Sequence, residues 1–122
     1  MALVVAWVAL AFTLPRAVPR TLTVDITCRS GNSVVGVWIE ATAGGSGWAS
    51  AGVQGTAKAA RYTFSHGFGG DYQVRAGCGG TADNWAVRTA SDTRGDLYRR
   101  LDCDDTRYLP PDPAVCTDVP AG

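Results

Sequence analysis

Apolar and polar residues alternate along several short stretches of this chain, and the clearest of these is residues 21–28. The apolar positions there share one parity and are Leu22, Val24, Ile26 and Cys28. A period of two places the apolar set on one face of a strand and the polar set on the other. Residues 21–28 are therefore predicted to form a half-buried strand.

We expect the fold to be organised around residues 33–48, which contain a strand pattern, a glycine hinge and a returning tryptophan. Val37 and Ile39 lie on the apolar parity of that strand. Gly36 lies on the other parity, where it is expected to leave room beside the Trp38 ring. The residues that precede this stretch are typical of a turn, so the two strands are predicted to pair as a hairpin.

Further strands are predicted along the rest of the chain, separated by glycine-rich or polar segments. They are residues 48–53, 61–66, 72–78, 85–89 and 97–103. The last two are joined by a polar turn at residues 90–96, and residues 55–58 form a loop. Four prolines follow Asp104 and disfavour regular sheet, so residues 104–122 are predicted to be an irregular tail. We therefore expect an all-β domain at residues 21–103, a small antiparallel β-sandwich or barrel.

Residues 1–20 differ from the rest because they hold the unbroken apolar run 2–14. As a helix, these thirteen residues cover about 20 Å, which is less than the roughly 30 Å hydrocarbon core of a bilayer. The length suits a signal peptide, and Ala9 and Ala11 match a cleavage pattern, although no basic residue precedes the run. The alternative is that the start codon is misassigned and that this run is the back half of a membrane anchor. In both cases we expect an extracytoplasmic protein, secreted or anchored to the membrane through this apolar N-terminal helix.

Four cysteines stand far apart, and the closest two, Cys103 and Cys116, are thirteen positions apart. Because a structural zinc site usually contains a closely spaced cysteine pair, two disulfides in an oxidising compartment are the simpler interpretation, and no metal is expected. Cys28 and Cys78 each continue the inward phase of their strands, so we predict that they pair across the core. Cys103 and Cys116 would then close the tail, and pairing of Cys28 with Cys103 is the alternative.

Length and charge limit the classes of function. With 122 residues the chain forms one domain at most in addition to its apolar start, and a hydrophobic content of 46% is enough for a core. The formal net charge of +0 excludes a broad electrostatic attraction to nucleic acid or to an anionic membrane surface. No nucleic-acid partner is therefore expected, and the membrane is expected to be contacted only through the N-terminal segment.

Candidates for catalysis and metal binding are few. His66 is the single histidine, and Ser65 beside it in a strand would point to the opposite face, which argues against a Ser-His-Asp site. The acidic residues lack the spacing of a calcium loop, and a solvated tail explains them equally well; they are Asp102, Asp104, Asp105, Asp112 and Asp118. Residues 94–96 form the integrin-binding tripeptide Arg-Gly-Asp, which also occurs by chance in turns. We expect no enzyme activity, no catalytic residue and no cofactor.

The tryptophans are the candidate binding residues. Exposed aromatic side chains stack on sugar rings, whereas buried ones contribute to the core. We assign Trp38 to the core, since disulfide-linked sandwiches often pack a tryptophan against the bridge. Both roles remain open for Trp48, which follows the glycine hinge, and for Trp85, and these two are the candidate ligand-binding pair.

Several patches of this sequence, taken together, resemble an extracytoplasmic module of actinobacterial proteins. They are TCRSG at 27–31, VVGVW at 34–38, GGSGWA at 44–49 and GCGGT at 77–81, followed by Trp85. The resemblance covers about residues 21–116. No activity is established for the module, which commonly follows a membrane segment, so the resemblance implies an extracytoplasmic location and no catalytic residue. Longer members continue past the position of Cys116, where this chain soon ends.

The leading hypothesis is a non-enzymatic, exported β-domain with two disulfides that acts as an accessory or interaction module at the cell surface. A cell-wall glycan and a surface protein are its candidate partners. A second hypothesis is a carbohydrate- or peptidoglycan-binding module that uses Trp48 and Trp85. A third is a small hydrolase that uses His66 and an acid.

Overall fold

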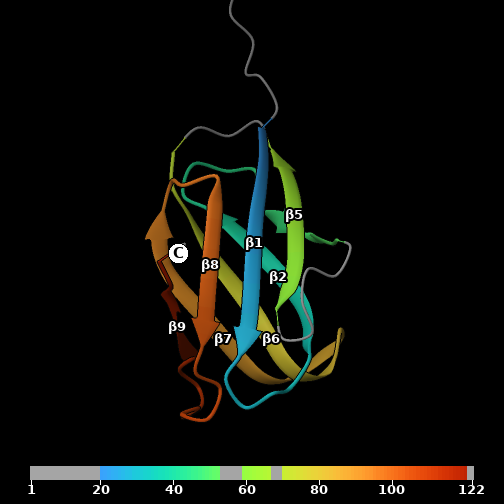
Figure 1. Ribbon diagram of the computed structural model, residues 1–122. Helices are drawn as coiled ribbons and strands as arrows, with labels where there is room; N and C mark the ends of the chain where they lie inside the picture. Colours follow the sequence, from blue (N-terminus) through green and yellow to red (C-terminus); the bar gives the residue numbers. More distant parts are fainter. Residues whose placement is uncertain (1–19, 53–58, 67–69, 121–122) are drawn as a thin grey trace, which may run out of the picture.

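The computed structural model describes residues 20–52, 59–66 and 70–120 of the chain (Figure 1). The predicted N-terminal helix and the predicted loop at 55–58 lie outside these ranges. The described residues form nine strands. They are β1 (Arg20–Cys28), β2 (Val34–Ala41), β3 (Gly47–Trp48), β4 (Ser50–Ala51), β5 (Ala60–His66), β6 (Tyr72–Thr81), β7 (Asn84–Arg94), β8 (Tyr98–Cys103) and β9 (Ala114–Asp118). Within these ranges, no helix has the length and apolar character needed to cross a membrane.

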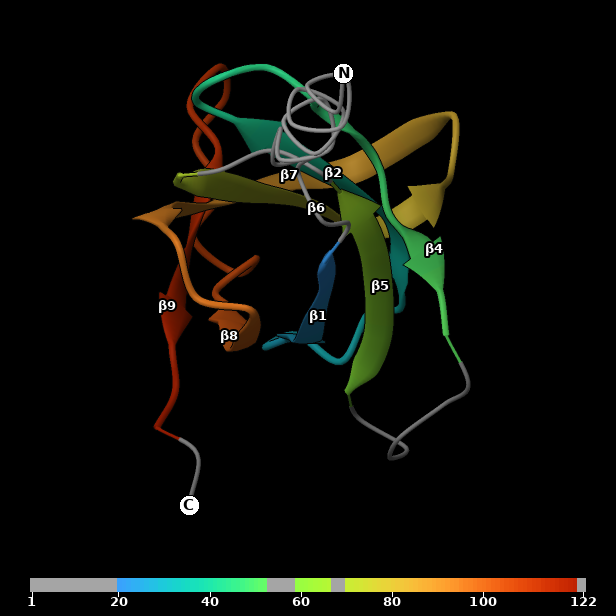
Figure 2. The same ribbon diagram turned by 90° about the horizontal axis from the view of Figure 1, so that it is seen from above.

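All nine strands belong to one sheet, in the order β3-β2-β6-β7-β9-β8-β1-β5-β4. The two edge strands, β3 and β4, follow one another directly in the chain and are separated only by Ala49. The sheet therefore curls until its edges meet, and Figure 2 shows the resulting ring of strands from above. The protein is an all-β, nearly closed barrel, which decides between the two predicted architectures.

The seam of the barrel is bridged by the short segment that carries β3 and β4. Trp48 in β3 pairs with Trp38 in β2, whereas Ser50 in β4 pairs with Thr63 in β5. Between them, the Ala49 amide donates a hydrogen bond of 2.9 Å to a carbonyl of β2. The strand predicted at 48–53 thus exists as two pieces that pair with opposite edges of the sheet.

The predicted hairpin between the first two long strands is wrong. β1 pairs with β5 in the antiparallel sense and with β8 in the parallel sense, so both of its edges are occupied. After the turn, β2 instead lies beside β6, where Val34 pairs with Cys78. Cys78 is bonded to Cys28 of β1 across the core, so the turn carries the chain to the opposite wall of the barrel. Figure 1 shows β8, β1 and β5 on the near wall and β2, β6 and β7 on the far wall.

Two further predictions about the second half of the chain need correction. The predicted turn at 90–96 is largely strand, because β7 continues to Arg94. The predicted irregular tail contains β9, which pairs with β8 in the antiparallel sense and with β7 in the parallel sense. The five residues of β9 lie between prolines and contain none, and their alternation buries Ala114 and Cys116. Because β1–β8 and β7–β9 are parallel pairs, the sheet is mixed rather than purely antiparallel.

Both disulfides and the buried alternating positions of β1, β2 and β6 agree with the sequence analysis. The alternating apolar positions of β1, β2 and β6 are buried and form one cluster with residues of β5, β8 and β9. Cys28 is bonded to Cys78, with 5.9 Å between their Cα atoms, and Cys103 is bonded to Cys116. No described cysteine is free. Two disulfides in so small a domain are typical of an oxidising, extracytoplasmic environment.

Candidate functional site

Three tryptophans from three strands meet on the outer face of the barrel wall formed by β2, β6 and β7. The centroid of the Trp48 ring lies 4.9 Å from that of Trp38 and 6.0 Å from that of Trp85. Both pairs are close to perpendicular, at 77° and 78°, which is a favourable geometry for aromatic rings. Trp48 remains 61% exposed. The structure thus brings together the predicted pair Trp48 and Trp85 and adds Trp38 on the other side of Trp48.

Trp38 is not a core residue, contrary to its assignment from the sequence. Its parity in β2 is that of Gly36 and Glu40, and the opposite parity, which includes Val37 and Ile39, fills the core. The core cluster is filled by smaller side chains, and no tryptophan of the described residues belongs to it. Trp38 is instead half-buried beside Trp48, its partner in the β2–β3 register.

The Trp85 ring lies over two glycines of the neighbouring strands. A Cβ at Gly77 would come within 2.3 Å of the Trp85 ring, and one at Gly36 would come within 3.0 Å of its Nε1. The Trp85 Nε1 donates a hydrogen bond of 3.1 Å to the Ala82 carbonyl, which helps to hold the ring flat on this surface. Gly36 therefore makes room for Trp85 and not, as predicted, for Trp38.

The tryptophans form one side of a groove of about 670 Å³, which is within the range of small-molecule binding sites. We call it the tryptophan groove. Its lining residues are Trp38, Glu40, Trp48, Gln73, Arg75, Trp85, Arg88, Thr89, Ala90 and Pro113. An apolar wall beside charged and amide side chains suits a ligand that has both an apolar face and a polar rim.

Glu40 supplies a negative charge in the groove. It accepts hydrogen bonds from the Ser46 hydroxyl at 2.9 Å and from the Trp38 Nε1 at 3.2 Å. These two hydrogen bonds, the Ser46 one first, lower the pKa of Glu40, and the nearby charge of Arg75 acts in the same direction. Arg75 lies 3.5 Å from Glu40 and donates a hydrogen bond of 3.0 Å to Gln73. The three polar side chains therefore form one connected row beside the tryptophans.

Sequence reasoning missed the polar part of this groove. Glu40 shares the outward parity of Trp38, and Gln73 and Arg75 share the outward parity of β6, so their direction could be read from the pattern. Their convergence could not, because it depends on β6 lying between β2 and β7. No local signal places Arg88 beside them.

His66 is the last residue of β5, where its backbone pairs with Arg20 of β1. Its side chain lies outside the described part of the structure, so the predicted absence of catalysis by His66 remains a prediction.

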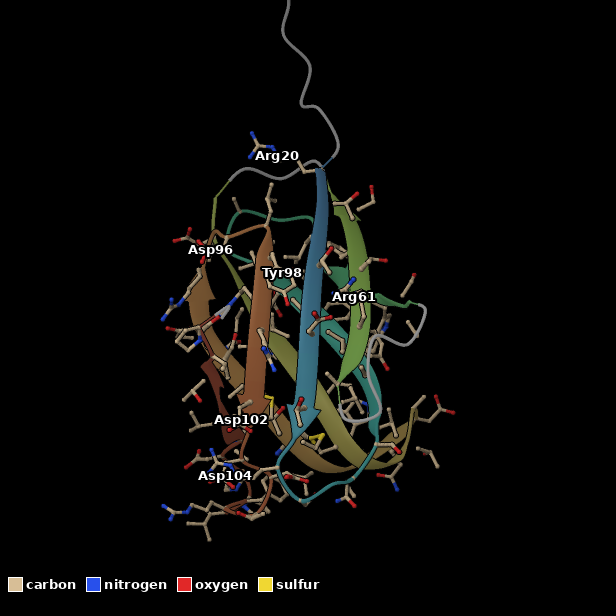
Figure 3. The ribbon with its side chains drawn as sticks, in the orientation of Figure 1. Arg20, Arg61, Asp96, Tyr98, Asp102 and Asp104 are labelled. Atoms are coloured by element: carbon tan, nitrogen blue, oxygen red, sulfur yellow. A yellow bond between two sulfur atoms is a disulfide. The ribbon has the colours of Figure 1, made fainter. Side chains whose placement is uncertain are left out.

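Three acidic residues at the end of β8 and just after it contact protein groups. Asp102 and Asp104, labelled at the lower end of the barrel in Figure 3, bind the Arg29 guanidinium at 2.7 and 2.8 Å. Asp105 is buried and accepts hydrogen bonds from the Ser30 amide and hydroxyl. These contacts connect the turn after β1 to the end of β8 and the residues that follow it.

One grouping of potential metal ligands occurs among the described residues, and it consists of Cys28, Cys78 and Asp105. The two sulfur atoms are bonded to each other, so they present no thiolates.

The tripeptide at 94–96 lies where β7 ends, and Arg94 forms ion pairs with Asp92 and Asp118 at 3.1 and 3.2 Å. The charged side chain of Arg94 thus has structural partners within the barrel.

Comparisons of the chain with known protein families, with curated proteins and with solved structures find no match. The resemblance to an actinobacterial extracytoplasmic module therefore remains an expectation from the sequence patches alone.

Proposed function

We propose that this protein is an exported, non-enzymatic binding module of the cell surface, and that the tryptophan groove binds a sugar ring of a surface glycan. The observation that carries the proposal is the exposed ring of Trp48, held between Trp38 and Trp85 beside a row of polar side chains. The two disulfides support an extracytoplasmic setting in which such glycans occur.

The chemistry of the groove matches that of a pyranose ring. One face of such a ring presents C–H groups, which stack on an aromatic side chain, and its edge carries hydroxyl groups. Glu40 accepts hydrogen bonds, Arg75 donates them and Gln73 does both, so the polar row complements hydroxyls of either role. Hydrogen bonds to the charged side chains of Glu40 and Arg75 are stronger than those to the neutral amide of Gln73.

The groove is also preorganised. Trp85 is seated on Gly77 and Gly36, and Trp38 is hydrogen-bonded to Glu40, so neither ring has to be ordered when a ligand binds. Because ordering side chains opposes association, a rigid aromatic surface retains more of its contact energy as affinity.

The test is calorimetric titration of the protein with soluble cell-wall glycan fragments, after quenching of tryptophan fluorescence has identified a binding fragment. Trp48→Ala is expected to weaken binding about tenfold or more, which corresponds to at least about 1.4 kcal/mol. Leu109→Ala is the matched control, because it removes another highly exposed apolar side chain outside the groove. His66→Ala should also bind as the parent does, with the glycan recovered at its original length.

An unchanged affinity of Trp48→Ala, or the absence of binding to every glycan fragment, would contradict the proposal. Shortening of the glycan that His66→Ala abolishes would instead support the hydrolase hypothesis. Circular dichroism of each variant should match that of the parent, since Trp48 lies outside the core cluster.

A further inference from the structure

We propose that the sugar bound in the tryptophan groove carries a carboxylate, and that Arg88 is the residue that pairs with it. This inference rests on the proposed function, because it names the class of glycan that the same groove would select. It is carried by the position of Arg88, by its hydrogen bonds and by the charges around it.

Arg88 lies beside the aromatic surface. In the β6–β7 register it stands opposite Gly77, the residue on which the Trp85 ring is seated. Its side chain lines the tryptophan groove together with Trp48 and Trp38. A group bound against the tryptophans would therefore be within reach of the Arg88 guanidinium.

Two neutral oxygens hold the Arg88 guanidinium in place. Its Nε donates to the Tyr108 hydroxyl at 3.2 Å, and one terminal nitrogen donates to the Pro111 carbonyl at 2.9 Å. These bonds orient the guanidinium but leave its positive charge uncompensated. No ion pair among the described residues includes Arg88.

Most other described arginines are neutralised within the protein. The arginines paired with a carboxylate are Arg29, Arg61, Arg75, Arg94, Arg99 and Arg107. Of the described arginines without such a pair, Arg88 is the one that lines the tryptophan groove. Arg100, on β8, likewise forms no ion pair with a described residue and lies outside this groove, so it offers a matched comparison.

The charges of the groove therefore do not balance. Arg75 and Glu40 lie 3.5 Å apart and compensate each other, which leaves the charge of Arg88 in excess. A planar guanidinium matches a carboxylate particularly well, because it can donate two parallel hydrogen bonds to the two oxygens. Sugars that offer a carboxylate next to a stackable ring are uronic acids and sugars with a lactyl ether side chain, and both present the same chemistry to Arg88.

The experiment measures affinities by calorimetry for two matched pairs of oligosaccharides. The first pair is an oligogalacturonate and its methyl ester, in which a methyl group on each carboxyl removes the negative charge. The second pair is a peptide-free peptidoglycan glycan strand, which carries lactyl carboxylates, and a neutral chitin oligomer of the same length. The parent protein is expected to bind at least one acidic member about tenfold more tightly than its neutral partner, and that member identifies the source of the carboxylate.

Arg88→Gln is expected to abolish this preference by weakening binding of the acidic member about tenfold, with binding of the neutral member unchanged. Arg100→Gln should retain the preference. Arg88→Lys keeps the charge but not the planar fork, so it should retain a smaller preference and provides a second test if Arg88→Gln unfolds.

Equal binding of the acidic and neutral members by the parent protein, with both lost in Trp48→Ala, would overturn the carboxylate inference and leave the proposed function intact. A preference that persists in Arg88→Gln would also overturn it. Absence of binding to all four oligosaccharides would overturn both the inference and the proposed function.

Discussion

Gly77 lies beneath the Trp85 ring, and the missing side chain is what allows the ring to rest on the sheet. The nearest atoms to a Cβ at Gly77 would all belong to Trp85, at 2.3 to 2.7 Å. Contacts of this length are far shorter than van der Waals distance, so any larger residue displaces the indole. At the scale of single residues, the geometry of the tryptophan groove therefore depends on a glycine that does not itself line the groove.

Gly77→Ala should lower the free energy of unfolding by about 2 kcal/mol, because an added methyl group in a packed site forces the surrounding groups to shift. It should also weaken glycan binding, since the Trp85 ring is moved. Urea denaturation and calorimetry measure the two effects.

The control for that substitution is the same change in a Trp85→Ala background, where the obstructing ring is absent. There Gly77→Ala should cost only a few tenths of a kcal/mol, and the difference between the two backgrounds measures the contact. Equal costs in both backgrounds would show that the glycine is required for another reason.

At the scale of elements, ion pairs around one buried arginine join β7, β8 and β9. The Arg99 side chain of β8 is 0% exposed and binds Asp92 of β7 at 2.6 Å and Asp118 of β9 at 2.7 Å. Its guanidinium also lies 5.6 Å from the centre of the Tyr72 ring. The three strands are thus held together by a charge that would be costly to leave unpaired.

The pKa of Asp118 lies below its ordinary value of 3.8, first because of the hydrogen bond from Arg99 and then because of the charges of Arg99 and Arg94, with burial opposing them. The stability gained from this carboxylate is therefore complete above about pH 3.8 and is lost as the pH falls through the lower pKa of the folded state. Asp118→Asn should destabilise the protein by about 2 kcal/mol at neutral pH and flatten its loss of stability in acid. Thermal denaturation at intervals of about one pH unit between roughly pH 2 and pH 7 measures both the loss of stability at neutral pH and its dependence on pH.

Asp25→Asn is the matched comparison for that prediction. The pKa of Asp25 is also lowered, chiefly by the hydrogen bond from Arg61, which is reinforced by one from Tyr98. Arg61 and Tyr98 belong to the near wall in Figure 3, and half-exposed pairs of this kind contribute about 1 kcal/mol at most. A larger effect at Asp25 than at Asp118 would contradict the view that burial of Arg99 sets the size of the loss.

At the scale of the whole molecule, the two disulfides differ in what they connect. Cys28–Cys78 links opposite walls of the barrel and closes a loop of 50 positions. Cys103–Cys116 links residues that face each other in the β8–β9 pair and closes a loop of 13 positions. In the chain-entropy description, the longer loop restricts the unfolded chain more strongly.

Replacing both cysteines of one bridge by serine should therefore lower the free energy of unfolding by about 4 kcal/mol for Cys28–Cys78 and about 3 kcal/mol for Cys103–Cys116. Urea denaturation of the two double variants measures this order. A larger loss for the Cys103–Cys116 variant would show that local pairing of β9 outweighs restriction of the unfolded chain.

The sequence by itself determined where most strands run and which side chains of those strands are buried, since a period of two is a local property of the chain. Leu22, Val24 and Ile26 illustrate this, and the same phase argument correctly paired Cys28 with Cys78. The sequence also identified Trp48 and Trp85 as candidate binding residues, because exposed aromatic side chains can stack on sugar rings, although it could not show that the two rings meet.

The tertiary structure alone decided the strand order and, through it, the composition of the tryptophan groove. A turn signal predicts a chain reversal but not which edge of the sheet the next strand joins, so β1 and β2 were wrongly predicted to pair. β9 was missed because prolines flank it in the sequence. Trp38, Gly36 and Arg88 acquire their roles from the order β3-β2-β6-β7, which places these four strands side by side. The pairing of β2 with β6 depends on contacts between distant parts of the chain, and no local pattern encodes it.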